Sequence, residues 1–172
     1  MYEIEQKYKI SGPSKLRAVL KKMKAVKSRS GAEVNILYDR QGELVDRRSV
    51  LRLRHWGGRE GVLTFKGPRL SGPFKRRIEI ETAVEFRAAE KILDFLGYKS
   101  AGVYKKKREE YRLGKAHVTL DWLPGAGWFA EIEASPAGID RLEKKLGLTG
   151  CREERTYLEL AGLPPRISRK VD

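Results

Sequence analysis

The sequence predicts an α+β fold in which most strands are antiparallel, and three observations carry this prediction. Apolar and polar residues alternate with a period of two along most of the chain, which is typical of strands with one packed face. Glycine- and proline-containing turn signals separate these runs at short intervals, which favours hairpins. Helical spacing is confined to three stretches, so helices accompany the strands without alternating regularly with them.

Eight strands are expected. The first is the opening stretch, where Tyr2, Ile4, Tyr8 and Ile10 alternate with charged residues. The other seven are expected at residues 34–39, 49–55, 61–66, 76–82, 103–113, 116–122 and 128–134. Turn signals such as Gln41-Gly42, Gly57-Gly58 and Gly67-Pro68 lie between them.

Three helices are expected to pack against the strands through ordinary apolar faces. The first follows a turn at residues 11–14, the second ends at Gly97, and the third begins after Ser135-Pro136 and ends at Gly147. Their apolar stripes are Leu16, Val19, Leu20, Met23 and Val26; Phe86, Ala89, Leu93 and Leu96; and Ile139, Leu142 and Leu146.

Composition limits the class of protein. The 172 residues suit a single domain, expected over residues 1–163, followed by a basic tail at 164–172. One cysteine and two histidines argue against a disulfide and a Cys/His zinc site, and a cytoplasmic location is expected. No apolar run suggests a membrane span or a signal peptide. The net charge of +14 predicts an anionic partner.

Charged residues of one sign gather in pairs on single strand faces. Glu-x-Glu occurs three times, at residues 3 and 5, 79 and 81, and 131 and 133. Basic pairs occur at Arg52 and Arg54 and at Lys106 and Arg108. A solvated outer face explains any one of these pairs, but it explains the set poorly because neighbouring like charges repel. Carboxylate pairs favour a divalent cation, and arginine and lysine favour phosphate.

These faces would converge if the sheet curled into a closed barrel with a charged lumen. Such a lumen would suit a metal ion together with a polyphosphate. A nucleic-acid surface would not need glutamates among its basic residues. The basic run Lys21, Lys22, Lys24, Lys27 and Arg29 could bind RNA, but a solvated helix face is the favoured interpretation.

The opening Glu3-Ile4-Glu5-Gln6-Lys7 resembles the ExExK signature of the CYTH superfamily, the triphosphate tunnel metalloenzymes. The resemblance extends to Leu160 through LYDRQGELVDRRSVLRLR, LTFKGP, RRIEIE, KKKRE, LDWLPGAGWFAEIE and TYLELAGL. It implies an antiparallel eight-stranded β-tunnel with helices packed outside. It also implies a cofactor, Mg²⁺ or Mn²⁺, and a triphosphate-containing small molecule such as ATP or inorganic triphosphate as ligand.

The resemblance implies roles for individual residues. The metal-site acids would be Glu3, Glu5, Glu79, Glu81, Asp121, Glu131 and Glu133. The triphosphate-binding cations would be Lys7, Arg52, Arg54, Lys66, Lys106, Arg108 and, less strongly, Arg77, which could instead pair with glutamates. Lys7 or Lys66 could serve as the catalytic base, as could a metal-bound hydroxide.

The reaction is left open between two chemistries. The ending Thr156-Tyr157-Leu158-Glu159-Leu160 resembles the prokaryotic branch called class IV adenylyl cyclases, which favours conversion of ATP to cyclic AMP and pyrophosphate. Hydrolysis of an inorganic or nucleoside triphosphate is the alternative, as is a binding module without catalysis. Leu37 stands where thiamine triphosphatases have a tyrosine, which argues against that specificity. A homodimer is plausible for the group.

Overall fold

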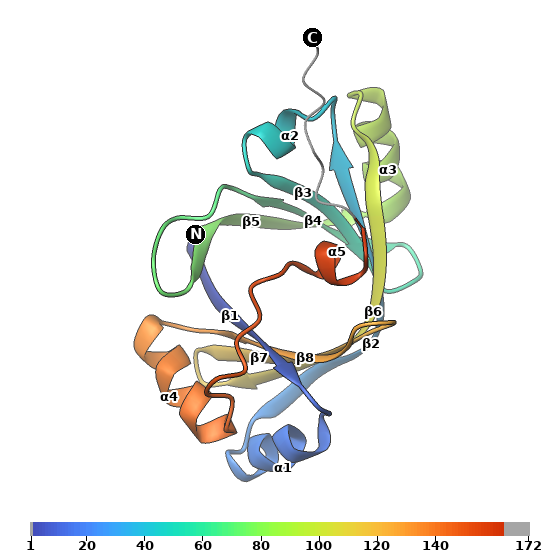
Figure 1. Ribbon diagram of the computed structural model, residues 1–172. Coiled ribbons are helices and arrows are strands. Elements are labelled where there is room, and N and C mark those ends of the chain that lie inside the picture. Colours follow the sequence, from blue (N-terminus) through green and yellow to red (C-terminus); the bar gives the residue numbers. More distant parts are fainter. Residues whose placement is uncertain (1, 164–172) are drawn as a thin grey trace.

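The computed structural model describes residues 2–163, and eight antiparallel strands in it close into a ring (Figure 1). Their order around the ring is β1-β5-β4-β3-β2-β6-β7-β8, and β1 pairs with both β5 and β8. The prediction of an antiparallel eight-stranded tunnel with helices outside is confirmed. The basic tail expected at residues 164–172 lies outside the described residues.

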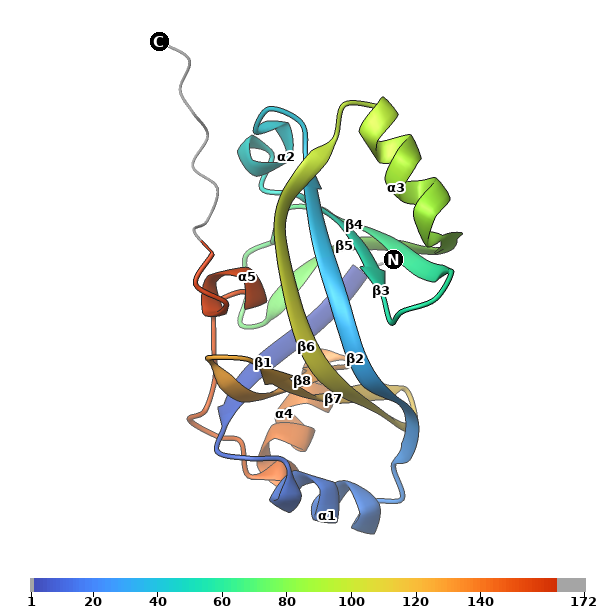
Figure 2. The same ribbon diagram turned by 90° about the vertical axis from the view of Figure 1, so that its right-hand side faces the viewer.

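The strands are β1 Tyr2–Ile10, β2 Val26–Asp39, β3 Val50–His55, β4 Glu60–Lys66, β5 Lys75–Glu85, β6 Lys99–Leu113, β7 Ala116–Leu123 and β8 Gly127–Glu133. The expected start of β2 at residue 34 was wrong by eight residues. Residues 26–32 are exposed on both faces, so no apolar alternation marks them, but they pair with β6 as far as Arg112. Figure 2 shows β2 and β6 running side by side along the length of the molecule.

The helices are α1 Ser14–Lys22, α2 Glu43–Asp46, α3 Phe86–Phe95, α4 Pro136–Leu146 and α5 Tyr157–Leu160. The expectation that Val26 belongs to the apolar stripe of the first helix was wrong. Lys24 adopts a left-handed φ of 58°, and Ala25 donates a hydrogen bond back to the Leu20 carbonyl, which ends α1 in a Schellman motif. The basic run at residues 21–29 is therefore divided between a helix end and a strand.

Two apolar clusters form outside the ring. The helices α1 and α4 cover β1, β7 and β8, and residues such as Leu20, Ile132 and Ile139 are completely buried there (Figure 1). Each such side chain contributes roughly 1.5–3 kcal/mol to folding. The helix α3 covers β3 and β4 in a second, smaller cluster around Leu53. None of the helices described in residues 2–163 has the length and apolar character needed to cross a bilayer.

Candidate active site

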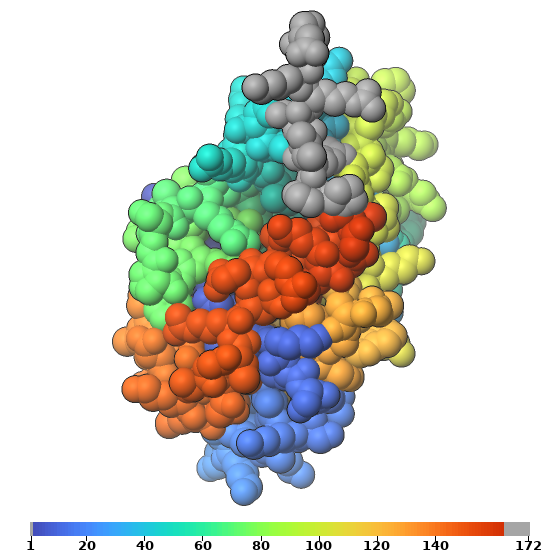
Figure 3. Space-filling model, viewed as in Figure 1, coloured from blue at the N-terminus to red at the C-terminus, as the bar shows by residue number. Residues whose placement is uncertain are grey.

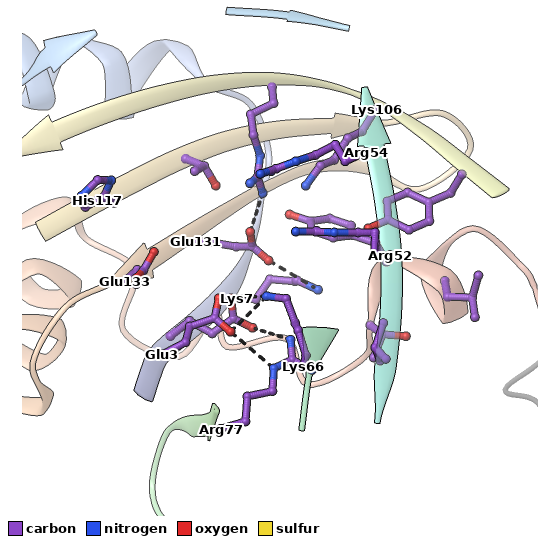
Figure 4. A pocket seen from close by; sticks show the side chains of 18 of the residues that line it. Glu3, Lys7, Arg52, Arg54, Lys66, Arg77, Lys106, His117, Glu131 and Glu133 are labelled. Atoms are coloured by element: carbon purple, nitrogen blue, oxygen red, sulfur yellow. Dashed lines mark hydrogen bonds and ion pairs between the residues drawn. The ribbon is translucent and has the colours of Figure 1, made fainter. Parts of the chain in front are cut away.

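The charged strand faces converge inside the ring on a cavity of about 600 Å³ (Figure 4). All seven of the cations expected to bind triphosphate line it: Lys7, Arg52, Arg54, Lys66, Arg77, Lys106 and Arg108. Of the seven expected acids, Glu3, Glu5, Glu81, Glu131 and Glu133 line it as well. The period-2 rule places them together, because alternate residues of every strand point to the interior of the closed ring.

Glu5 and Glu133 form a like-charged pair. They are direct cross-strand partners on β1 and β8, and both line the cavity. The ion pair from Glu5 to Arg77 is long, at 3.9 Å. Burial and the nearby charges of Glu131 and Glu3 raise the pKa of Glu5. Like charges in directly opposed positions destabilise a sheet unless a cation lies between them.

Glu133 shares this shortage of positive charge, whereas Glu3 accepts hydrogen bonds from Lys66 at 3.0 Å and from Arg77 at 3.3 Å. Burial and the charge of Glu3 raise the pKa of Glu133, which lies in a solvent-exposed part of the cavity. Burial and Glu79 raise the pKa of Glu3, although Lys66 and Arg77 act in the opposite direction. Figure 4 shows Glu3 and Glu133 on the same side of the cavity.

The other expected acids pair with lysine and arginine side chains of the protein. Glu79 accepts a 2.7 Å hydrogen bond from Lys66, and Glu81 accepts one of 3.2 Å from Arg52. Asp121 is completely buried and accepts two hydrogen bonds, of 2.7 and 2.6 Å, from the guanidinium of Arg108. The structure thus separates the expected acids into a cation-deficient group and a group that orients the basic side chains.

Glu131 belongs to the second group. It accepts a 2.6 Å hydrogen bond from Arg108 and lies 3.8 Å from the ammonium of Lys7. Burial raises the pKa of Glu131, but Arg108, Lys106 and Lys7 outweigh it, and the net shift is downward. Glu131 is therefore a carboxylate held ionised by the cations around it.

The cation-deficient group fits a hard divalent ion. No group of three or more acidic, histidine or cysteine side chains within residues 2–163 is arranged to hold a metal ion. The donors at Glu5 and Glu133, with Glu3 nearby, are carboxylate oxygens, which magnesium and manganese prefer. Magnesium uses few protein carboxylates and completes its octahedron with water and substrate phosphate. A pair of carboxylates in a cavity lined by basic side chains has this character.

Lys7 is the expected base whose pKa is shifted by its surroundings. Its side chain is 4% exposed and donates a 3.0 Å hydrogen bond to the carbonyl of Arg155. Burial lowers the pKa of Lys7 to about 8, although Glu131 acts in the opposite direction. Lys66, the other expected base, lies 3.0 Å from Glu3 and 2.7 Å from Glu79. The neutral form of Lys7 is therefore accessible near pH 8.

Two arginines retain unused hydrogen-bonding capacity. The buried Nε atoms of Arg52 and Arg54 have no hydrogen-bond partner among the described residues. Both side chains line the cavity and come from β3 two residues apart. Guanidinium groups match phosphate oxygens in pairs, so this strand face suits an extended anion.

Comparison with known proteins places the chain in a family. The family model described as the CYTH domain matches residues 1–151. The chain belongs to the CYTH family. A protein of Methanocaldococcus jannaschii named "Putative adenylate cyclase MJ0240" is 31% identical over 95% of this CYTH chain and 100% of its own length.

Solved structures share the CYTH fold. A Vibrio parahaemolyticus protein described as a putative adenylate cyclase has a TM-score of 0.80 and 24% identity, over 94% of this chain and 98% of its own. A Hippeastrum protein described as a putative adenylyl cyclase with a dominant triphosphatase activity has a TM-score of 0.70 and 16% identity, over 93% and 95%. These TM-scores establish a common fold.

Sequence reasoning missed three residues of the CYTH tunnel. Glu33 is completely buried and lies 3.4 Å from Lys106 and 3.9 Å from Arg54. Lys75 is 6% exposed and donates a 2.9 Å hydrogen bond to the Glu153 carbonyl. Each lies just before an expected strand, on the face that carries the charged residues. Starting the expected β2 and β5 one residue earlier would therefore have found them. Tyr157, on the four-residue α5, gave no periodic signal.

The segment that carries Tyr157 crosses one end of the CYTH tunnel. We call residues 151–163 the C-terminal strap. Figure 1 shows α5 in front of the ring, and Figure 3 shows the strap covering the face between β1 and the β4–β5 connection. The strap is tied to β1 by backbone hydrogen bonds from Lys9 to Cys151 and from Glu153 to Lys7.

Proposed function

We propose that this CYTH protein is a divalent-metal-dependent enzyme that binds ATP through its triphosphate and converts it to cyclic AMP and pyrophosphate. The supporting observation is the convergence of seven cationic side chains on one cavity beside the opposed carboxylates Glu5 and Glu133. Polyphosphate binding needs the first feature and metal binding needs the second. The relative named as an adenylate cyclase supports the choice of reaction.

Glu5 and Glu133, together with Glu3, would hold the metal ion, which would neutralise phosphate charge and polarise a phosphoryl oxygen. Arg52, Arg54, Lys66, Lys106 and Arg108 would bind the remaining phosphate oxygens, with Arg77 as a weaker contributor. Because phosphoryl transfer requires little covalent chemistry from the protein, positioning and charge stabilisation would supply most of the rate.

The reaction needs one proton acceptor. The ribose 3′-hydroxyl would attack the α-phosphorus, forming the new P–O bond while the bond to the bridging oxygen of pyrophosphate breaks. Lys7 is our candidate for the base, since its neutral form is accessible near pH 8. The proton would pass from the 3′-hydroxyl to the Lys7 amine as the leaving pyrophosphate is stabilised by the surrounding cations.

Hydrolysis of a triphosphate is the second candidate. The structure of the Hippeastrum protein, described with a dominant triphosphatase activity, has the same fold. The same cations and carboxylates would bind the substrate, and water would attack the terminal phosphorus in place of the ribose hydroxyl. The two reactions differ in which phosphorus lies in line with the nucleophile.

The deciding experiment is to incubate the protein separately with ATP and with inorganic triphosphate, with Mg²⁺ or Mn²⁺, and to separate the products chromatographically. Cyclic AMP and pyrophosphate from ATP, lost in Glu5→Gln, are expected. Formation of ADP or orthophosphate would transfer the assignment to the triphosphatases. Metal-dependent binding without turnover would contradict both enzymatic assignments and leave a binding module.

A further inference from the structure

Tyr157 lies inside the tunnel although it belongs to a segment outside the family match. The CYTH model ends at residue 151, whereas Tyr157 starts α5 within the C-terminal strap. Its side chain is 7% exposed and lines the same cavity as the expected phosphate-binding residues. The part of the chain that matches the family model therefore does not include this wall of the cavity.

The strap is built to hold this side chain in place. Thr156 and Glu159 form a capping box at the start of α5, in which Thr156 accepts from the Glu159 amide at 3.2 Å. Leu158 packs so close to β6 that a Cβ on Gly102 would lie 2.9 Å from its Cδ1. Upstream, Arg152 donates hydrogen bonds of 3.0 and 2.8 Å to Glu143 on α4. Contacts on both sides of Tyr157 thus fix where its side chain enters the cavity.

The ring of Tyr157 contacts two of the basic residues. The ammonium nitrogen of Lys7 lies 3.8 Å from the ring centroid, and that of Lys106 lies 4.0 Å from it. Both lysines are almost completely buried. A desolvated aromatic face attracts an ammonium group and offers it no proton acceptor.

The hydroxyl of Tyr157 contacts the support of the same cations. It donates a hydrogen bond to Oδ2 of Asp121, an oxygen that also accepts from Lys106 at 3.2 Å and Arg108 at 2.6 Å. One side chain thus connects two lysines and the carboxylate that orients an arginine.

We propose that Tyr157 is a positioning residue for substrate: its ring holds the side-chain nitrogens of Lys7 and Lys106, and its hydroxyl orients Asp121, so that Lys106 and Arg108 face the triphosphate and Lys7 stays clear of Glu131. This inference rests on the proposed function. Without the ring, Lys7 would move toward Glu131 and Lys106 toward Asp121 and Glu33, which already lie within 4 Å of them. Carboxylate-bound lysines would be less available to phosphate oxygens.

The test compares Tyr157→Leu, Tyr157→Phe and a control, Tyr98→Leu. Tyr98 lies away from the cavity and carries the guanidinium of Arg40 over its ring at 5.3 Å. Binding of tripolyphosphate with Mg²⁺ is measured by calorimetry, KM and kcat are measured with ATP, and thermal unfolding reports the fold. Tyr157→Leu should weaken binding and raise KM about tenfold or more, with a smaller change in kcat. Tyr157→Phe should recover most of the loss, and Tyr98→Leu should leave KM unchanged.

A second variant shifts Tyr157 through its neighbour Leu158, which also lines the cavity. Gly102→Ala places a methyl group against Leu158 and should raise KM in the same direction, and adding Leu158→Ala should reverse part of the increase. Equal tripolyphosphate affinity in the wild type and in folded Tyr157→Leu would overturn the proposal. So would a loss of thermal stability with unchanged KM. Absence of binding by the wild type would instead refute the proposed function on which it rests.

Discussion

Replacing Glu33 with glutamine should destabilise the protein by about 3 kcal/mol at neutral pH and by much less in acid. Burial raises the pKa of Glu33, but Lys106, Arg108 and Arg54 outweigh it and lower that pKa from 4.5 to about 2. One pKa unit corresponds to about 1.4 kcal/mol, so the charged form contributes roughly 3 kcal/mol. Glutamine removes the charge and keeps an oxygen that can accept from Asn35.

The stabilisation by Glu33 depends on pH through proton linkage. Because the pKa of Glu33 is lower in the folded state, its contribution is complete above the ordinary value near 4.5 and is lost as pH falls toward about 2. Denaturant unfolding of the wild type and Glu33→Gln at pH 7 and at pH 3 measures this. The gap between the two proteins should shrink by about 2 kcal/mol at pH 3.

Glu90→Gln is the matched control, because Glu90 makes a 2.8 Å ion pair with Arg87 on the surface of α3. It should change stability by less than about 0.5 kcal/mol at pH 7. A gap between wild type and Glu33→Gln that stays constant between pH 7 and pH 3 would refute the electrostatic account. Glu33 would then act through packing alone.

Three further predictions concern the site itself. Glu5→Gln should raise the unfolding temperature of the metal-free protein, because it removes the repulsion from Glu133. It should also abolish the stabilisation by Mn²⁺ that we expect in thermal scans of the wild type. Full stabilisation of the Glu5→Gln variant by Mn²⁺ would exclude this metal site. The kcat/KM profile should rise through about pH 8 as Lys7 loses its proton, and Lys7→Arg should remove this rise; a profile unchanged in Lys7→Arg would assign the base elsewhere. Arg108→Lys should raise KM about tenfold, since lysine cannot reproduce the paired hydrogen bonds to Asp121; an unchanged KM in steady-state kinetics would show that those bonds do not orient the site.

The sequence alone specified which face of each strand would carry the chemistry. Arg52 and Arg54 share parity on β3, and both line the cavity as the alternation requires. The face on which a side chain lies follows from its position along the strand, so it can be predicted without knowing how the ring closes. It does not tell which acid meets which base, because that depends on how distant strands are paired. The contact of Lys66 with Glu3 joins β4 to β1 across an intervening strand, and only the closed ring reveals it.

The position of the C-terminal strap could not be predicted from the alternation of residues along strands. The four residues of α5 are too few for a helical period to be visible, and Tyr157 is one aromatic residue among seven tyrosines in the chain. Its position is set by anchors on β1, α4 and β6, all distant in sequence. Nothing in its immediate neighbours indicates that its side chain enters the tunnel.

The pairing of β1 has a consequence for how the chain folds during synthesis. Of the described strands this one is made before the others, but its partners are at residues 75–78 on β5 and 128–133 on β8. The ring therefore cannot close until most of the chain has been made, and such non-local pairing is slow. Until then the edge of β1 that will pair with β8 is unpaired, and the charges of Glu3, Glu5 and Lys7 discourage pairing with another chain. Side chains that face the tunnel in the finished protein would thus protect the unfinished one from aggregation.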